Sequence, residues 1–139
     1  ADTPQLLKLR SDAIDLLRQG RMREVLQANL AFAFHPAHAQ ALAPRYLAMM
    51  DRAGADQLIA QNRAVMARAD QRPWLPQVRC PTLLVVGVND LLTPPEHAQE
   101  MAALIPGARL ELIDECVHLL TWEQPQRLNQ LLIDWLAQL

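Results

Sequence analysis

Residues 82–97 read TLLVVGVNDLLTPPEH, and this stretch is the most informative part of the chain about the fold of its second half. Its first part, Thr82 to Val88, is a continuous apolar run of the kind that forms a strand buried on both faces of a parallel sheet. The run stops at a carboxylate, Asp90. Thr93 then follows as a helix cap, with Glu96 placed to complete a capping box. The stretch therefore predicts a strand, a short loop that carries an acid, and a helix.

The same order of elements repeats towards the end of the chain. Residues 108–114, ARLELID, predict a second strand, and residues 124–139 predict a final helix with Glu123 as its cap. Strand, helix, strand, helix indicates a right-handed crossover and a parallel pair of strands. Two strands do not make a stable open sheet, and no third candidate is visible. We therefore expect an incomplete sheet, in which the strand at 82–88 needs a neighbour that this chain does not encode.

The first half of the chain shows only helical periodicity. Gly20 is expected to end a first helix whose inner face includes Leu9, and Pro44 is expected to start a third helix that ends at Gly54. A fourth helix is expected to follow, and then the proline-rich segment 70–81 reads as a linker. The sequence thus predicts a helical segment over residues 1–75 and a strand-containing segment over residues 76–139.

Composition excludes several classes of function. The chain has 139 residues, with 13 Lys and Arg against 15 Asp and Glu, so it offers no basic face for nucleic acid or anionic membrane. It contains no apolar segment of the roughly 20 residues that a membrane span needs, and no signal pattern. Its two cysteines lack Cys-x-x-Cys spacing, which favours a reducing cytoplasmic location. The first residue is not Met, so position 1 is not expected to be the natural translation start.

Two ionisable side chains follow the two predicted strands. Asp90 lies two residues beyond the first strand and His118 lies four beyond the second. If the strands are parallel neighbours, both loops leave on one edge, and the Asp90 carboxylate can bind one ring nitrogen of His118 and fix its tautomer. Each residue also has an ordinary interpretation, since Asn-Asp is common turn chemistry and a loop histidine is usually solvated.

The second half of the sequence resembles a known family. Residues 80–125, CPTLLVVGVNDLLTPPEHAQEMAALIPGARLELIDECVHLLTWEQP, look like the C-terminal segment of the α/β-hydrolase fold family. The likeness covers about Val78 to Leu139 and implies an α/β fold in which a mainly helical lid precedes the last two strands. It also implies that Asp90 is the acid of a catalytic triad and that His118 is the general base.

The resemblance leaves the nucleophile unassigned. The family places its serine on a Gly-x-Ser-x-Gly turn upstream of the acid, and no such turn occurs here. The only serine, Ser11, has no flanking glycines and is expected to be a solvated hydroxyl on a helix. The family also usually has glycine directly before its histidine, where this chain has Val117. A positive φ there would strain a β-branched residue.

Other candidate residues have weaker support. Cys116 could be a thiol activated by His118, although a small packing residue is the simpler account. His35 and His38 have a spacing that zinc ligands can use, but no third ligand is evident, so we expect neither a metal nor another cofactor. Asp2 is an alternative position for the acid. Cys80 and Trp74 are expected to be core residues.

These observations lead to two hypotheses about function. The first is the lid and acid/base portion of a serine hydrolase, esterase-like, that acts on a small apolar ester or lactone and is inactive without an upstream nucleophile. The second is a catalytically incomplete hydrolase fragment that self-associates by strand pairing or swapping. The partners expected are a small-molecule substrate and either a missing N-terminal half or a second copy in a dimer, with no nucleic acid and no membrane.

Overall fold

The computed structural model describes residues 2–139, which form two compact units. The helical unit comprises residues 2–30 and 43–71, and the sheet unit comprises residues 31–42 and 72–139. The chain passes from the helical unit into the sheet unit and back before it enters the strands. Within residues 2–139, no helix combines the length and the apolar composition needed to cross a membrane.

Three helices account for the first half of the chain: α1 (Pro4–Arg18), α2 (Met22–Ala33) and α3 (Pro36–Met66). The expectation that a helix starts at Pro44 is wrong, because α3 begins at Pro36 and Pro44 lies inside it. Pro36 carries the same N-terminal signal, and Pro44 is accommodated inside the helix although it lacks a backbone donor. The predicted break at Gly54 is confirmed, because this residue has φ 78° and ψ 164°, a conformation open mainly to glycine.

The face of α1 that is buried is not the predicted one, which included Leu9. Ile14 and Leu17 of α1 are buried, whereas Leu9 is 53% exposed, contrary to expectation. The helical period alone does not fix which of two adjacent stripes faces the core, because leucines and alanines lie on both. The buried residues that pack together are Ile14, Leu17, Val25, Leu26, Leu58 and Ile59.

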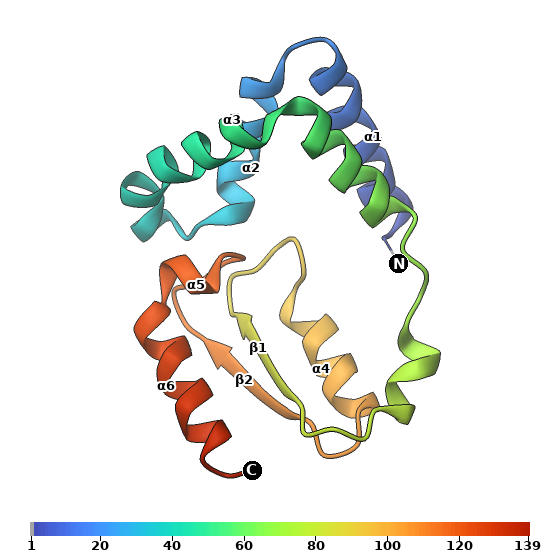
Figure 1. The fold of residues 1–139 in the computed structure, drawn as a ribbon, viewed down its shortest axis with the longest axis vertical. Coiled ribbons are helices and arrows are strands. Elements are labelled where there is room, and N and C mark those ends of the chain that lie inside the picture. The colour runs from blue at the N-terminus through green and yellow to red at the C-terminus, as the bar shows by residue number, and fades with distance from the viewer. Residues whose placement is uncertain (1) are drawn as a thin grey trace. The chain divides into compact units, whose positions relative to one another are not determined.

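The sheet unit contains the predicted alternation of strands and helices. After a short 3₁₀ helix, η1 (Arg72–Gln77), the order is β1 (Leu83–Gly87), α4 (Pro95–Leu104), β2 (Arg109–Ile113), α5 (Leu120–Glu123) and α6 (Pro125–Leu136). The strands are parallel, with Leu83 opposite Arg109 and Gly87 opposite Ile113. This confirms the predicted parallel pair. Figure 1 shows the two strands between α4 and α6.

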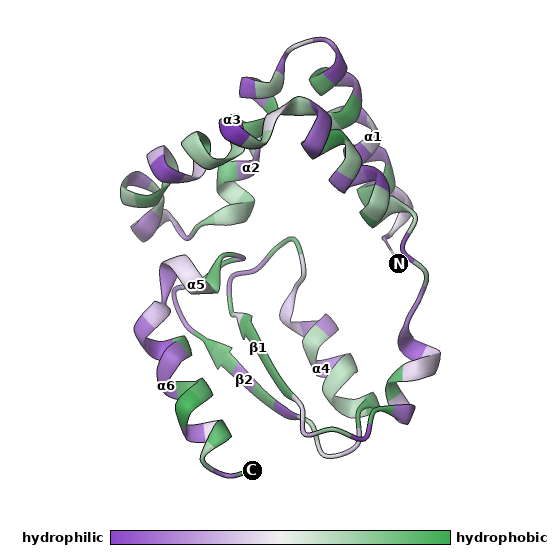
Figure 2. Cartoon of the chain, viewed as in Figure 1, coloured by the Kyte–Doolittle hydropathy of each residue, from purple (hydrophilic) through white to green (hydrophobic). Residues whose placement is uncertain are grey.

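The sheet of the described residues has these two strands only, so one edge of β1 is unpaired within residues 2–139. Figure 2 shows β1 as hydrophobic along its length, whereas the helices mix hydrophilic and hydrophobic residues. Ile113 packs with Leu131 of α6 and with Cys116 in the core of this unit. The incomplete sheet expected from the sequence is therefore present.

Two predicted helix caps and two predicted core residues are wrong. α4 begins after Pro94 without a side-chain cap, and Thr93 donates its hydroxyl to Asp90 instead. α6 begins after Gln124, and the side chain of Glu123 is buried against other segments. Cys80 is exposed, as is Trp74 at 61%. The Thr93 cap is thus replaced by a local bond to Asp90, whereas Glu123 is held by contacts with distant segments.

Candidate active site

The loops that follow the two strands leave the sheet on one edge. Gly87 and Ile113, the last residues of β1 and β2, are directly paired in the parallel register. Beyond them the main chains remain bonded: the Val88 N–H donates to the Ile113 carbonyl at 2.9 Å, and the Asn89 N–H donates to the Cys116 carbonyl at 3.0 Å. The loop of the acid and the loop of the histidine are thus held together by backbone hydrogen bonds.

Asp90 is buried and strongly bonded within its own loop. Its side chain is 2% exposed. Oδ1 accepts the N–H groups of Leu92 at 2.8 Å and Thr93 at 2.9 Å, and Oδ2 accepts the Thr93 hydroxyl at 2.8 Å. These three donors fix the carboxylate in one orientation, because each oxygen is bound on a different side. The local Asn-Asp turn chemistry anticipated from the sequence is present, and it leaves part of Oδ2 for another donor.

His118 supplies that other donor. Its Nδ1 lies 2.9 Å from Asp90 Oδ2, and Thr93 Oγ1 is a further 3.4 Å neighbour of the same nitrogen. A proton on Nδ1 satisfies the carboxylate, which leaves Nε2 as the acceptor nitrogen of the neutral ring. The His118 side chain is 36% exposed, and its hydrogen-bond partners in the described part of the chain are all at Nδ1. The ring is therefore oriented on one side and open on the other.

Gly87, the last residue of β1, lies against the histidine loop. A Cβ on this residue would lie 2.3 Å from the carbonyl oxygens of both Cys116 and Val117. No side chain can be accommodated at that distance without moving the histidine loop. A glycine inside a strand often marks such a close approach of two backbones, and this signal was available in the sequence.

Val117 does not have the positive φ that would strain its backbone. Among residues 2–139, the only residue other than glycine with positive φ is Glu115, at 49°. The turn of the histidine loop is therefore made two residues earlier than the position that glycine would occupy in the family pattern. Val117 is instead a buried apolar residue with an ordinary backbone.

Cys116 is not an activated thiol. It is fully buried, and burial together with the nearby Glu123 and Asp90 carboxyl groups raises its pKa to about 12. The thiol therefore stays protonated near neutral pH, where an activated nucleophile would need a lowered pKa. Its Sγ lies 3.6 Å from Glu123 Oε1, to which it can donate.

The remaining candidates have other partners. Asp2, the alternative acid, bonds Arg10 Nε and lies 3.6 Å from Arg68 in the helical unit. The rings of His35 and His38 are 6.0 Å apart, and no group of three or more potential metal ligands occurs among residues 2–139. The structure therefore brings together Asp90 and His118 and engages Asp2 elsewhere.

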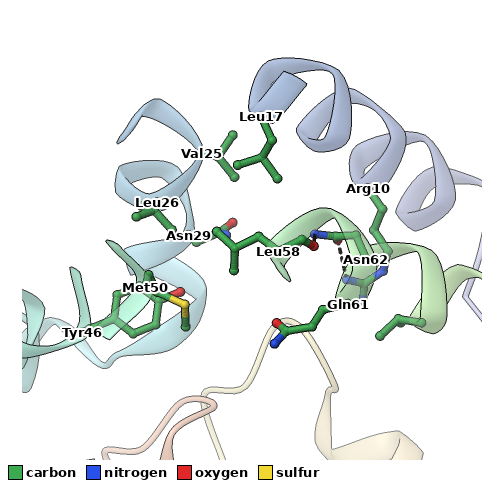
Figure 3. A pocket seen from close by; sticks show the side chains of 11 residues that line it. Arg10, Leu17, Val25, Leu26, Asn29, Tyr46, Met50, Leu58, Gln61 and Asn62 are labelled. Atoms are coloured by element: carbon green, nitrogen blue, oxygen red, sulfur yellow. Dashed lines mark hydrogen bonds between the residues drawn. The ribbon is translucent and has the colours of Figure 1, made fainter. Parts of the chain in front are cut away.

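The helical unit contains a cavity of its own, of about 210 Å³ (Figure 3). Apolar residues of its core form part of the wall, and Met50 is among them. Polar groups also face the cavity: the Arg10 guanidinium donates to Asn62 Oδ1 at 3.4 Å, and the Asn62 amide donates to the Leu58 carbonyl at 3.0 Å. Two of the polar residues that line it, Arg10 and Asn62, are thus bonded to each other.

Comparison with known proteins identifies the architecture. The family model of the alpha/beta hydrolase fold matches residues 19–125. A 2-hydroxy-6-oxo-6-phenylhexa-2,4-dienoate hydrolase of Delftia acidovorans is 31% identical over 80 residues, which is 58% of this chain and 28% of that protein. A pimeloyl-[acyl-carrier protein] methyl ester esterase of Neisseria meningitidis is 29% identical over 97 residues, which is 70% of this chain and 36% of that protein.

A solved structure gives the same result for the fold. The thermophilic esterase of Thermogutta terrifontis superposes with a TM-score of 0.88 at 25% identity, over 99% of this chain and 52% of that one. This chain therefore spans about half the length of that esterase, and its matches to the two curated relatives cover about a third of their length or less.

Proposed function

The chain belongs to the α/β-hydrolase fold family, and we propose that it carries the acid and the general base of an esterase-like hydrolase, Asp90 and His118. The observation that supports this proposal best is the 2.9 Å contact between His118 Nδ1 and Asp90 Oδ2. The contact lies beyond the carboxyl ends of two parallel strands, where open α/β sheets generally bind ligands. The relatives of this chain are hydrolases, which is consistent with such a pair.

The geometry is compatible with different roles for His118 and Asp90. With its Nδ1 proton donated to Asp90, His118 presents Nε2 as a base that can take the proton of an attacking hydroxyl. The hydroxyl oxygen would add to the ester carbonyl, and the proton would then pass from Nε2 to the departing alcohol. Water would release the acyl group by the same proton path. Asp90 would stabilise the imidazolium at each stage, and its own three donors would keep it in place.

The nucleophile in this proposal comes from outside residues 2–139. Ser11, the only serine of the chain, is exposed on α1 and lacks the flanking glycines of a nucleophile turn. We propose that a serine in the remainder of a longer hydrolase completes the triad, and that the segment 1–75 is the lid of that enzyme. The isolated chain is accordingly expected to be inactive.

The substrate class proposed is a small apolar carboxylic ester or lactone. The relatives include a pimeloyl-[acyl-carrier protein] methyl ester esterase and a 2-hydroxy-6-oxo-6-phenylhexa-2,4-dienoate hydrolase, which supports the carbonyl centre of this proposal and not the size or polarity of the substrate. Both names describe an acyl or carbonyl centre attached to a carbon chain. A panel of aryl esters, lactones and oxo-dienoates therefore discriminates between the subclasses.

The direct test uses the intact protein that contains this chain. His118→Ala is expected to lower kcat for a p-nitrophenyl ester by about 10³-fold or more, and Asp90→Asn by about 10²- to 10⁴-fold, because the base is lost or its tautomer is wrong. His97→Ala, at an exposed histidine of α4, is the matched control and should leave kcat unchanged. A fluorophosphonate probe should label the intact protein and not the isolated chain. Full activity in His118→Ala would overturn the proposal.

A second candidate function rests on the unpaired edge of β1. Within residues 2–139 this strand pairs with β2 alone, and an open edge is a template for another strand. We propose that the edge is covered either by the N-terminal half of a longer hydrolase or by a second copy of this chain in a dimer. Light scattering of the isolated chain over a range of concentrations distinguishes these two possible partners. A dimer supports the second copy, whereas a monomer that binds a separately produced N-terminal half supports the first.

A further inference from the structure

Glu123 is a buried carboxylate that the mechanism above does not use. Its side chain has no exposed surface. Oε1 accepts the Val117 N–H at 2.8 Å and is 3.6 Å from Cys116 Sγ, while Oε2 accepts the His35 N–H at 2.5 Å and is 3.5 Å from His38 Nδ1. Burying a carboxyl group lowers stability unless it is hydrogen-bonded, and removing a bonded one leaves its buried donors unsatisfied. Glu123 is therefore expected to have a specific role.

The two oxygens of Glu123 serve two different segments of the sheet unit. Val117 is the residue immediately before His118, so Oε1 holds the peptide that leads into the histidine. His35 stands directly before the start of α3, so Oε2 holds the corner between α2 and α3. Glu123 thus joins the histidine loop to His35, which lies 88 residues before Glu123 in the chain.

Further contacts join the same two segments. The Leu119 N–H donates to the Ala33 carbonyl at 3.3 Å, on the other side of His118 from Val117. Phe34 is 1% exposed and stacks on Trp122 with 6.1 Å between ring centroids. His118 is therefore flanked by two backbone amides, each of which is bonded to a fixed acceptor.

Only a carboxylate fits this arrangement. An ionised carboxylate accepts on both oxygens, whereas a glutamine of the same size presents an acceptor at one side and an NH₂ donor at the other. Replacement by glutamine would therefore leave either the Val117 N–H or the His35 N–H facing another donor. A role in filling space alone would be met equally well by glutamine, and this difference makes the role testable.

We propose that Glu123 is a positioning residue for His118: it fixes the histidine loop to the α2–α3 corner so that Nδ1 is held at the Asp90 carboxylate. Asp90 orients the ring from its side-chain end, and Glu123 orients it from the backbone. The catalytic importance of this contact rests on the proposed function, whereas the positioning itself does not.

The positioning is tested by NMR on the chain itself, with three variants. Glu123→Gln is expected to broaden or shift the His118 Nδ1 proton resonance and to speed the hydrogen exchange of the Val117 or His35 amide about tenfold, the effect of losing one hydrogen bond. Glu115→Gln removes the same charge from an exposed side chain of the same loop and should change neither signal. Asp90→Asn provides the reference spectrum in which the Nδ1 contact is altered directly.

The outcomes separate a local role from a general loss of structure. Glu123→Ala is expected to destabilise the sheet unit, so Glu123→Gln is the informative variant, provided that the amides of β1 and β2 keep their exchange rates. An unchanged His118 Nδ1 resonance together with unchanged Val117 and His35 exchange in a folded Glu123→Gln protein would overturn the proposal. Loss of the strand amides along with the loop amides would do so as well, because the effect would then be general.

In the intact enzyme the same variant has a kinetic signature. Glu123→Gln should lower kcat about tenfold with KM nearly unchanged, because a misdirected base affects the chemical step and not substrate binding. If His118→Ala has no effect on activity but the NMR changes are found, the proposed function fails and the positioning role stands. If His118→Ala abolishes activity and Glu123→Gln changes neither NMR nor kcat, the positioning role fails alone.

Discussion

The helical unit and the sheet unit hold their charged side chains in different ways. In the helical unit the exposed ion pairs join residues three or four positions apart, as with Lys8 and Asp12 at 2.7 Å, whereas the buried Asp2 pairs with Arg10 and Arg68. In the sheet unit Asp90 and Glu123 are buried, and their partners come from other loops, such as His118 and His35. Buried carboxylates in both units thus bind residues from other parts of the chain, whereas the exposed pairs of the helical unit are local.

The physical reason is the balance between desolvation and pairing. An exposed pair on a helix gains little, because water screens it and both side chains lose freedom. A buried carboxylate must be fully bonded, so the segments that supply its donors are held in place together. Three measurements test this difference between buried and exposed charge.

The largest effect is expected at Cys116, which lies beside both buried carboxyl groups. Burial and these neighbours raise its pKa from an ordinary 9.0 to about 12, so at pH 8 it has about 1000-fold less thiolate than an ordinary cysteine. Alkylation by iodoacetamide, followed by mass spectrometry, should label the exposed Cys80 at least about 1000-fold faster than Cys116. The thiolate population should rise with pH towards 12. Comparable labelling of the two at pH 8 would contradict the buried carboxyl environment.

An intermediate effect, on the free energy of unfolding, is expected when either of two glycines is replaced by alanine. Gly87→Ala should lower the free energy of unfolding by about 2 to 3 kcal/mol, because a Cβ would collide with two carbonyl oxygens of the histidine loop. Gly20→Ala in the helical unit, where φ is +76° and no atom lies within 4 Å of the new Cβ, should cost only about 1 kcal/mol. Urea titrations compare the two. Equal losses would show that the close approach at Gly87 relaxes without consequence.

The smallest effect is expected for an exposed ion pair. Lys8→Gln removes the contact to Asp12 while keeping a similar helix propensity, and it should cost about 0.3 kcal/mol at low salt. High salt should abolish the difference between the variant and the parent. A loss above about 1 kcal/mol, measured by the same urea titration, would mean that local pairs in the helical unit matter as much as the buried ones.

Much of the sheet unit could be predicted from the sequence. The run from Thr82 to Val88 is compatible with little other than a buried strand, and the order of elements then favours a parallel pair by the handedness of crossovers. From this pair it follows that Asp90 and His118 leave the sheet on one edge. The contact between them is present in the structure at 2.9 Å, although their catalytic roles stay predictions.

The local details were less predictable. Thr93 and Glu123 both carry strong capping signals, yet Thr93 bonds Asp90 in its own loop and Glu123 bonds Val117 and His35 in other segments. Leu9 shows that helical period does not select between adjacent stripes, and Cys80 shows that an apolar residue beside a strand can be exposed. Capping and burial preferences amount to about 1 kcal/mol, so tertiary contacts readily override them.

Hydrophobic periodicity within short segments was enough to predict the alternation of strands and helices in the sheet unit, and the lack of a third strand pattern predicted its incomplete sheet. Three-dimensional contacts were needed to show that Glu123 bonds both Val117 and His35, and that Gly87 lies against the carbonyl groups of the histidine loop. Those contacts join segments distant in the chain, and their energies depend on burial, which no local pattern specifies.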